Sequence, residues 1–188
     1  MKNKGRLARR IIAVIVCMTL ILAAVPTGVL GAFAQEKGTL RVTSISDIHY
    51  FADSEKGTGD TENGFSEAYN AWNDRGYREH NEANALIDAA LKKAVAEKSD
   101  YVFIPGDLTF NGELAGHKAL AAKLEAFEKE SGIQVIVVNG NHDVNNYRGL
   151  TFRNGVKESG EVTSPEAFRD IYKNLGRDLV TDEKEDVF

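Results

Sequence analysis

Cysteine is almost absent from this 188-residue chain, whose one cysteine is Cys17. Cys17 follows Val16, where a lipoprotein signal requires a small residue, so we interpret it as an ordinary apolar residue. Because no cysteine follows it, the rest of the chain can form neither disulfides nor thiolate metal sites. A structural zinc site of the cysteine type is excluded, whereas a site of histidine and carboxylate ligands is not.

Positive charge is also scarce, with 23 Lys and Arg against 28 Asp and Glu. Five of the basic residues and none of the acidic ones precede position 35, so the remainder of the chain carries a formal charge of −10. A chain this acidic gains no general electrostatic attraction to a phosphate backbone. We therefore expect no binding to duplex nucleic acid.

The first 34 residues have the layout of a secretory signal peptide. Basic residues precede an uncharged apolar run, Ile11 to Val25, and Ala32 and Ala34 occupy the −3 and −1 positions of a cleavage site. We expect cleavage after Ala34 and a secreted or extracytoplasmic protein. The alternative is an uncleaved anchor, because the uncharged stretch is long enough to span a bilayer. In that case the leader would be the protein's contact with the membrane.

Hydrophobic periodicity after the leader predicts alternating strands and helices. Short apolar runs are typical of buried strands, and helical stripes of apolar residues separate them. The expected strands are 40–46, 101–104 and 133–138, and the expected helices are 79–98, 114–131 and 165–175. The polar segment 50–76 has no clear period, so we expect a long loop there. The βαβαβ order predicts an α/β fold with a parallel sheet and right-handed crossovers.

Three polar clusters follow the three expected strands. They are Asp47-Ile48-His49, Gly106-Asp107-Leu108-Thr109 and Gly140-Asn141-His142-Asp143. Carboxylates, imidazoles and amides bind divalent cations, and open α/β sheets bind ligands beyond the carboxyl ends of their strands. We therefore predict a metal site at this rim. Its predicted ligands are Asp47, His49, Asp107 and Asn141.

Local spacing suggests how these clusters work. If the extended conformation persists beyond the first strand, Asp47 and His49 point the same way. His142 follows Asn141 directly and can face a substrate, while Asp143 can fix the tautomer of its ring. Each cluster alone is also typical of a turn. Their recurrence at three strand ends is what favours metal binding.

The three clusters resemble those of the calcineurin-like metallophosphoesterase family. The surrounding residues 46–50, 105–113 and 163–169 are similar to an exported bacterial branch that includes cyclic-nucleotide phosphodiesterase-like proteins. The resemblance covers most of 40–175 and implies the N-terminal half of a four-layer α/β/β/α sandwich. It also implies hydrolysis of small phosphomonoesters or phosphodiesters, including nucleotides. The site would hold two divalent ions, manganese, iron or zinc, and a bridging hydroxide.

The resemblance assigns a role to each residue of the site. Asp47 and His49 match ligands of the first metal, Asp107 matches the bridging carboxylate, and Asn141 matches a ligand of the second metal. His142 matches the residue that contacts phosphate and assists the leaving group, and Asp143 matches its orienting partner. These six residues are the expected metal-binding and catalytic set.

One part of the family pattern is missing. The family continues with a further histidine and a Gly-His-x-His segment, and neither follows Asp143. The resemblance thus implies a domain over 35–188 that is incomplete at its C-terminus, with a non-catalytic extracytoplasmic binding domain or an inactive fragment as alternatives. We expect His80 on the surface, and His117 as a cap or a support for the ligands. Trp72 is expected to pack the long loop in preference to stacking on a substrate.

Overall fold

The computed structural model describes residues 39–75, 80–176 and 179. The chain divides into one unit over Met1–Thr39 and another over Leu40–Phe188, and the elements below belong to the second. The leader predicted for residues 1–34 lies outside the described residues. Among the helices of the described part, none is long and apolar enough to cross a membrane.

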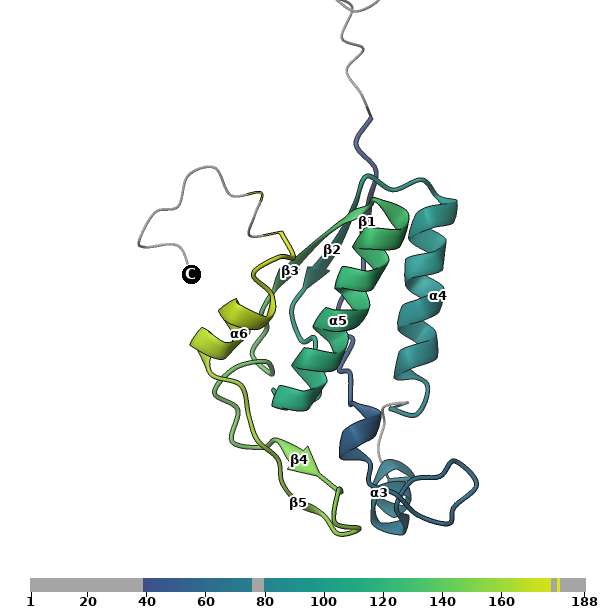
Figure 1. The fold of residues 1–188 in the computed structure, drawn as a ribbon, viewed down its shortest axis with the longest axis vertical. Coiled ribbons are helices and arrows are strands. Elements are labelled where there is room, and N and C mark those ends of the chain that lie inside the picture. The colour runs from purple at the N-terminus through teal and green to yellow at the C-terminus, as the bar shows by residue number, and fades with distance from the viewer. Residues whose placement is uncertain (1–38, 76–79, 177–178, 180–188) are drawn as a thin grey trace, which may run out of the picture. The chain divides into compact units, whose positions relative to one another are not determined.

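A three-stranded parallel sheet carries the fold (Figure 1). Its strands β1 (Val42–Ser44), β2 (Tyr101–Pro105) and β3 (Gln134–Val138) pair in chain order. Helix α4 (Ala83–Ala96) connects the first two strands, and α5 (Leu114–Ser131) connects the last two. The predicted α/β class and βαβαβ order are confirmed.

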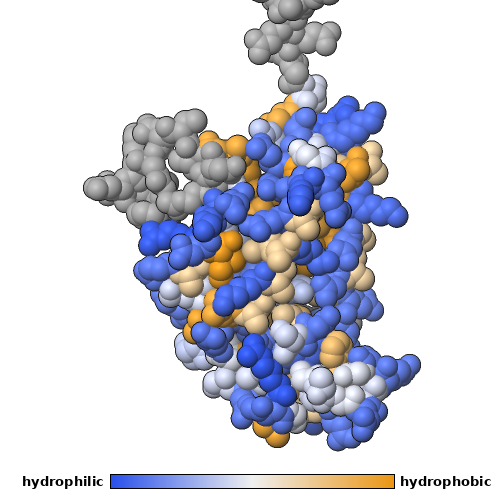
Figure 2. Space-filling view, in the orientation of Figure 1, coloured by the Kyte–Doolittle hydropathy of each residue, from blue (hydrophilic) through white to orange (hydrophobic). Residues whose placement is uncertain are grey.

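The two faces of the sheet differ in burial. Val102 and Val135 are paired neighbours on one face and have no exposed surface. They share a core with apolar side chains of the two connecting helices, among them Ile87, Leu91, Leu120 and Leu124. Each such side chain contributes about 1.5–3 kcal/mol when fully buried. On the other face of the sheet, Val42 and Val138 are about half exposed, at 50% and 47%. The solvent-facing surface of the helices is largely hydrophilic (Figure 2).

The helix ends follow the predicted capping chemistry. Helix α5 has the predicted bounds, and Gly132 terminates it with a left-handed φ of 73°. Helix α6 (Pro165–Ile171) begins after Ser164, whose hydroxyl accepts a hydrogen bond from the amide of Ala167 at 3.2 Å. It ends four residues earlier than predicted. The hydroxyl acceptor of Ser164 explains where α6 begins. Gly132 explains where α5 ends, because glycine has no Cβ atom to disfavour a left-handed φ.

The expectation of a long unstructured loop over 50–76 is wrong. The segment contains a 3-10 turn η1 (Asp53–Glu55) and helix α3 (Glu67–Asn73), and a hairpin of β4 (Leu150–Thr151) and β5 (Glu158–Ser159) follows β3. A second core holds the segment in place through three fully buried rings, those of Phe51, Tyr69 and Phe152. Helical periodicity missed it because seven residues make only two turns.

Candidate metal centre

Asp47, His49 and Asp107 meet at the carboxyl ends of β1 and β2. One donor atom from each side chain lies within 4.8 Å of the other two. Nε2 of His49 is 3.6 Å from Oδ2 of Asp107, and a cation with bonds of about 2 Å fits between atoms at such spacing. The structure thus brings together three of the four residues predicted to bind metal.

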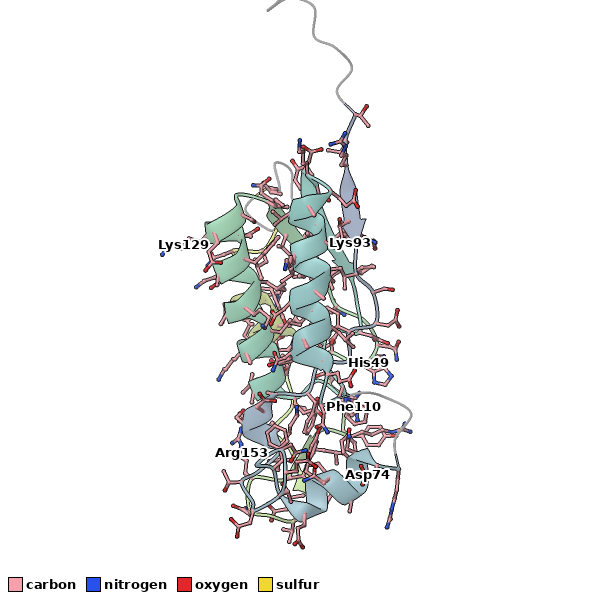
Figure 3. The ribbon with its side chains drawn as sticks, turned by 90° about the vertical axis from the view of Figure 1, so that its right-hand side faces the viewer. His49, Asp74, Lys93, Phe110, Lys129 and Arg153 are labelled. Carbon is pink, nitrogen blue, oxygen red and sulfur yellow. The ribbon has the colours of Figure 1, made fainter. Side chains whose placement is uncertain are left out.

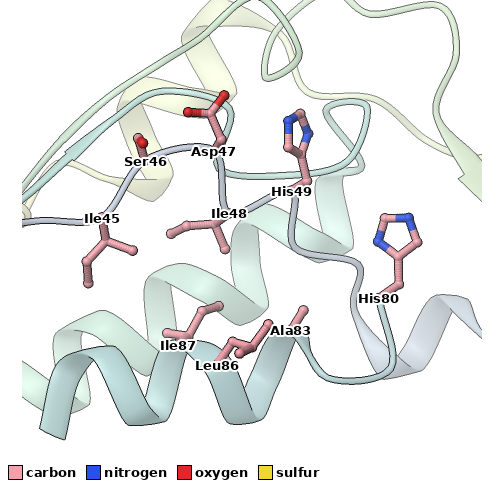
Figure 4. A pocket seen from close by; sticks show the side chains of 9 residues that line it. All are labelled: Ile45, Ser46, Asp47, Ile48, His49, His80, Ala83, Leu86 and Ile87. Atoms are coloured by element: carbon pink, nitrogen blue, oxygen red, sulfur yellow. The ribbon is translucent and has the colours of Figure 1, made fainter. Parts of the chain in front are cut away.

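These three residues share a backbone conformation that is rare outside glycine. Their φ angles are 54° at Asp47, 45° at His49 and 48° at Asp107. Left-handed backbone costs about 1–2 kcal/mol per residue and clusters at functional sites. The extended conformation, which was the condition for a shared direction of Asp47 and His49, does not persist, because β1 ends at Ser44 and both residues have positive φ. Both side chains nevertheless point to the same side of the chain (Figure 4).

The loops after β2 and β3 pack backbone against backbone. A Cβ atom on Gly106 would lie 2.9 Å from the Cα of Gly140, and a Cβ atom on Gly140 would overlap the side chain and amide of Asp107. Glycine at both positions therefore permits the approach of the two loops. Where the two loops meet, the main-chain amide of His142 donates a hydrogen bond to Oδ1 of Asp107 at 3.1 Å and so orients that carboxylate.

Asn141 belongs to the same rim. It is exposed and lies in the turn after β3. It stands between Gly140, which packs against Asp107, and His142, whose amide contacts the Asp107 carboxylate. Its role as a ligand of a second cation stays a prediction.

His142 stands beside the three converging residues. Its ring lies edge-on to that of His49, with 4.9 Å between centroids. Its Nδ1 is 2.7 Å from the carbonyl oxygen of Phe110 and 3.1 Å from Oδ1 of Asn111. A carbonyl oxygen can only accept, so Nδ1 carries the proton in this contact. Nε2 is then the ring nitrogen that can serve a substrate.

Asp143 does not hold the ring of His142, and this corrects the predicted pairing. Its carboxylate is fully buried and accepts hydrogen bonds from the amides of Leu108, Thr109 and Gly140 at 3.1, 2.9 and 2.7 Å. A buried carboxylate is stabilised by such donors. Asp143 therefore ties the loop after β2 to the loop after β3, and it acts on the centre through the backbone.

His117 supports Asp143 through the main chain of that residue. Its Nε2 donates to the carbonyl of Asp143 at 2.9 Å, and its Nδ1 is 3.0 Å from the hydroxyl of Tyr172. Burial lowers the pKa of His117, and the nearby Asp143 carboxylate opposes this only in part. A neutral ring with its proton on Nε2 satisfies both contacts. The interpretation of His117 as a support for the ligands agrees with this placement.

His80 is buried, and its predicted surface position is wrong. The residue is 3% exposed. Its ring stacks on that of Trp72, with centroids 5.2 Å apart and 10° between planes, and meets Phe110 edge-on at 4.8 Å. Trp72 packs the segment, as expected. Because the carbonyl of Phe110 accepts from His142, whose ring lies beside that of His49, this aromatic cluster continues into the rim of the metal centre, where Figure 3 labels His49 and Phe110.

A cavity of about 460 Å³ opens behind the chain that carries Asp47 and His49. It is lined by Ile45, Ser46, Asp47, Ile48, His49, His80, Ala83, Leu86 and Ile87. Figure 4 shows Ile45 and Ile48 pointing toward α4, whereas the side chains of Asp47 and His49 point to the opposite side. The cavity therefore borders the chain that carries Asp47 and His49, and the carboxylate and the imidazole of these two residues face away from it.

Sequence reasoning assigned no role to Phe110 or Asn111, which hold the ring of His142. A backbone carbonyl such as that of Phe110 leaves no sequence signature, because every residue has one. The signal for Asn111 is its place four residues after Asp107 and directly before Gly112, which has a φ of 74°. An amide side chain at such a turn commonly bonds to nearby backbone.

The family model described as calcineurin-like phosphoesterase matches residues 40–184. The chain belongs to the calcineurin-like phosphoesterase family. A search of the curated proteins finds no match. Membership of this phosphoesterase family implies a metal-dependent hydrolase of phosphate esters, and the convergence of Asp47, His49 and Asp107 provides a candidate metal site for it.

Proposed function

We propose that this chain hydrolyses small phosphate esters at a centre of two divalent cations, drawn from manganese, iron and zinc. The observation that carries the proposal is the convergence of Asp47, His49 and Asp107 within 4.8 Å. The ring of His142 lies 4.9 Å from that of His49. Acid–base and metal-binding groups therefore share one rim, which is the arrangement that phosphoester hydrolysis requires.

The residues at the rim fit divalent cations. Two carboxylates and an imidazole make a donor set of oxygen and nitrogen atoms, which suits manganese, iron and zinc. Three residues with left-handed backbone aim these donors. Asp47, His49 and Asp107 would hold one cation, and Asp107 with Asn141 would hold the second. Bound cations would lower the pKa of water and draw charge from a phosphoryl oxygen.

The remaining chemistry falls to His142. Hydrolysis breaks the bond between phosphorus and the leaving oxygen, and the electron pair of that bond stays on the oxygen. In its doubly protonated form His142 can give that oxygen the proton of Nε2 while Nδ1–H stays bonded to the carbonyl of Phe110. The ring is left neutral with its proton on Nδ1, and Nε2 regains a proton from the water that supplies the attacking oxygen. Asp143 contributes by holding the two loops together through its three backbone contacts.

The substrate is proposed at the level of its chemical class. The similarity of residues 46–50, 105–113 and 163–169 to cyclic-nucleotide phosphodiesterase-like proteins supports a diester, including a nucleotide. The monoester is the alternative within the same chemistry. The basic and apolar pattern of the first 34 residues supports action outside the cytoplasm.

The test is hydrolysis of two chromogenic esters by the purified full chain. Metal is removed with a chelator, manganese is titrated back, and turnover of p-nitrophenyl phosphate and bis(p-nitrophenyl) phosphate is measured. We expect manganese-dependent turnover of at least one ester. Asp107→Asn should lower it by about 100-fold or more, since loss of a ligand exceeds the effect of losing an outer partner.

Asp88→Asn is the matched control. Asp88 is a surface carboxylate paired with Lys123, away from the rim, and we expect its removal to leave turnover within about twofold. Unchanged turnover in Asp107→Asn would reject the proposal.

A second candidate is a domain that binds a cation without turnover. It is favoured by the composition of the rim. Among the described residues, one group of three histidine and acidic side chains is close enough to hold a metal ion, namely Asp47, His49 and Asp107. The same titration separates the two candidates. Binding of manganese without hydrolysis of either ester would support the binding domain.

A further inference from the structure

We propose that Asn111 is the positioning residue of His142 and couples its ring to the segment after the third strand. The inference rests on the proposed hydrolysis, because it concerns how His142 meets the leaving group. Asn111 is 6% exposed. Its Oδ1 is 3.1 Å from Nδ1 of His142, and its Nδ2 is 3.2 Å from the carbonyl oxygen of Arg148.

The orientation of the Asn111 amide is set by its backbone partner. The carbonyl of Arg148 can only accept a hydrogen bond, so the NH₂ end of the amide must face it. Oδ1 of Asn111 then faces His142, where it can only accept. At the other end, the carbonyl of Phe110 also accepts from Nδ1 of His142, at 2.7 Å. Two acceptors at Nδ1 keep a proton on that nitrogen, both in the neutral ring and in the doubly protonated ring that donates from Nε2.

Asn146 closes the network. Its Nδ2 donates to the carbonyl of His142 at 3.1 Å and lies 3.4 Å from Oδ1 of Asn111. Its Oδ1 accepts from the amide of Arg148 at 3.0 Å. Asn111 and Asn146 thus bridge His142 and Arg148 twice. Each amide has one orientation, because a backbone group of Arg148 fixes one end of it.

The main chain of Asn111 is also anchored. Its amide donates to Oε2 of Glu113 at 2.8 Å, and Oε1 of the same carboxylate accepts from the amide of Leu150 at 3.1 Å. Glu113 is 1% exposed. The main chain of Asn111 is therefore linked through Glu113 to the same segment that its side chain contacts at Arg148. This link preorganises the contact between Asn111 and His142.

The consequence concerns Nε2 of His142. With Nδ1–H directed at two fixed acceptors, Nε2 points away from them and is presented to the leaving oxygen in a single orientation. Loss of Asn111 leaves Phe110 as the lone acceptor at Nδ1, and the ring gains freedom to turn. Substrates whose leaving group needs the proton should suffer more than substrates with an activated leaving group.

A double-mutant cycle tests this coupling. Phenyl phosphate, a poor leaving-group substrate, is compared with p-nitrophenyl phosphate in wild type, Asn111→Ala, His142→Ala and the double variant. The corresponding diesters replace them if the enzyme takes diesters. We expect Asn111→Ala to lower kcat for the phenyl ester by about tenfold or more, with KM within about twofold and a smaller loss on the nitrophenyl ester. In the His142→Ala background it should have no further effect.

Asn154→Ala is the matched control. Asn154 bonds to Glu158 on the surface of the hairpin, and its removal should not change the ratio of the two rates. Thermal unfolding of each variant shows whether the fold is kept, and Asn111→Ser serves as the milder change. Equal losses on both esters, or additive effects of Asn111→Ala and His142→Ala, would overturn the proposal.

Nitrogen NMR of the zinc-loaded chain gives a readout that does not depend on activity. Long-range proton–nitrogen correlations should show the Nδ1–H tautomer of His142 in the wild type and a larger fraction of Nε2–H in Asn111→Ala. A wild-type ring in the Nε2–H form, or the same tautomer ratio in both proteins, would contradict the role of Asn111. A wild type without hydrolysis would reject the proposed function, and this spectrum would still decide the role of Asn111.

Discussion

The two sides of the metal centre are held in place by different means. On the side of β2 and β3, the buried carboxylate of Asp143 binds three amides of the neighbouring loops. On the side of β1, Asp47 is exposed. The chain there is positioned by main-chain bonds from His49 and Tyr50 to the carbonyls of Asp107 and Leu108, each 2.9 Å. The β1 side is thus bonded to the loop after β2, and the carboxylate of Asp143 holds that loop in place.

This dependence predicts that the two acidic residues differ sharply in their effect on stability. Asp143→Ala removes the acceptor of two buried amides and of the half-buried amide of Gly140, and we expect a loss of about 3–5 kcal/mol in the free energy of unfolding. Asp47→Ala removes an exposed carboxylate and should change it by about 0.5 kcal/mol or less. Urea denaturation of the metal-free chain measures both. Similar losses in the two variants would remove the distinction between the sides.

A methyl group between the two loops should disturb the same side without replacing a ligand. Gly140→Ala places its Cβ against the side chain and amide of Asp107. We expect a loss of about 1–3 kcal/mol in the free energy of unfolding from overpacking, and a fall in manganese affinity of about tenfold or more because Asp107 moves.

Gly132→Ala is the control for this change. Gly132 also requires unusual backbone, with a φ of 73°, but nothing lies within 4 Å of a Cβ atom there. It should lose about 1–2 kcal/mol of stability and bind manganese as the wild type does. Calorimetric titration measures the affinities, and equal affinity in Gly140→Ala would show that the approach of the loops does not aim Asp107.

The smallest expected effect is a pH dependence that arises at His117. Burial lowers its folded-state pKa, so the unfolded chain takes up a proton first as the pH falls below about 6.5. Stability should therefore fall on acidification from about pH 7 toward the lowered pKa, by at most about 1.4 kcal/mol per pH unit for one proton. In His117→Gln this part of the slope should vanish. A slope that is unchanged in the variant would place the titrating group elsewhere.

The sheet and its helices were predictable from sequence because their signals are local and repeated. The apolar run of β3 and the stripe of α5 with Gly132 at its end give the observed elements within a residue or two. The placement of the polar clusters at strand ends followed from the strand order. The side chains of Asp47 and His49 face one side, as expected, although the backbone that achieves this is left-handed and not extended.

The contacts between loops could not be predicted in the same way. Asp143 and His142 are adjacent in sequence, which favoured a pairing between them. In the fold, the Asp143 carboxylate turns to the amides of the loop after β2, and Asn111 takes the place beside the ring. His80 was misplaced for a similar reason. Its partners Trp72 and Phe110 lie on separate segments, and no periodic pattern links them.

The most direct test of the metal centre is anomalous diffraction from crystals of the full chain grown with manganese. We expect a peak within about 2.5 Å of a side-chain donor atom of Asp47, His49 and Asp107. A manganese peak elsewhere, or none at this rim at saturating metal, would contradict the convergence on which the proposed hydrolysis depends.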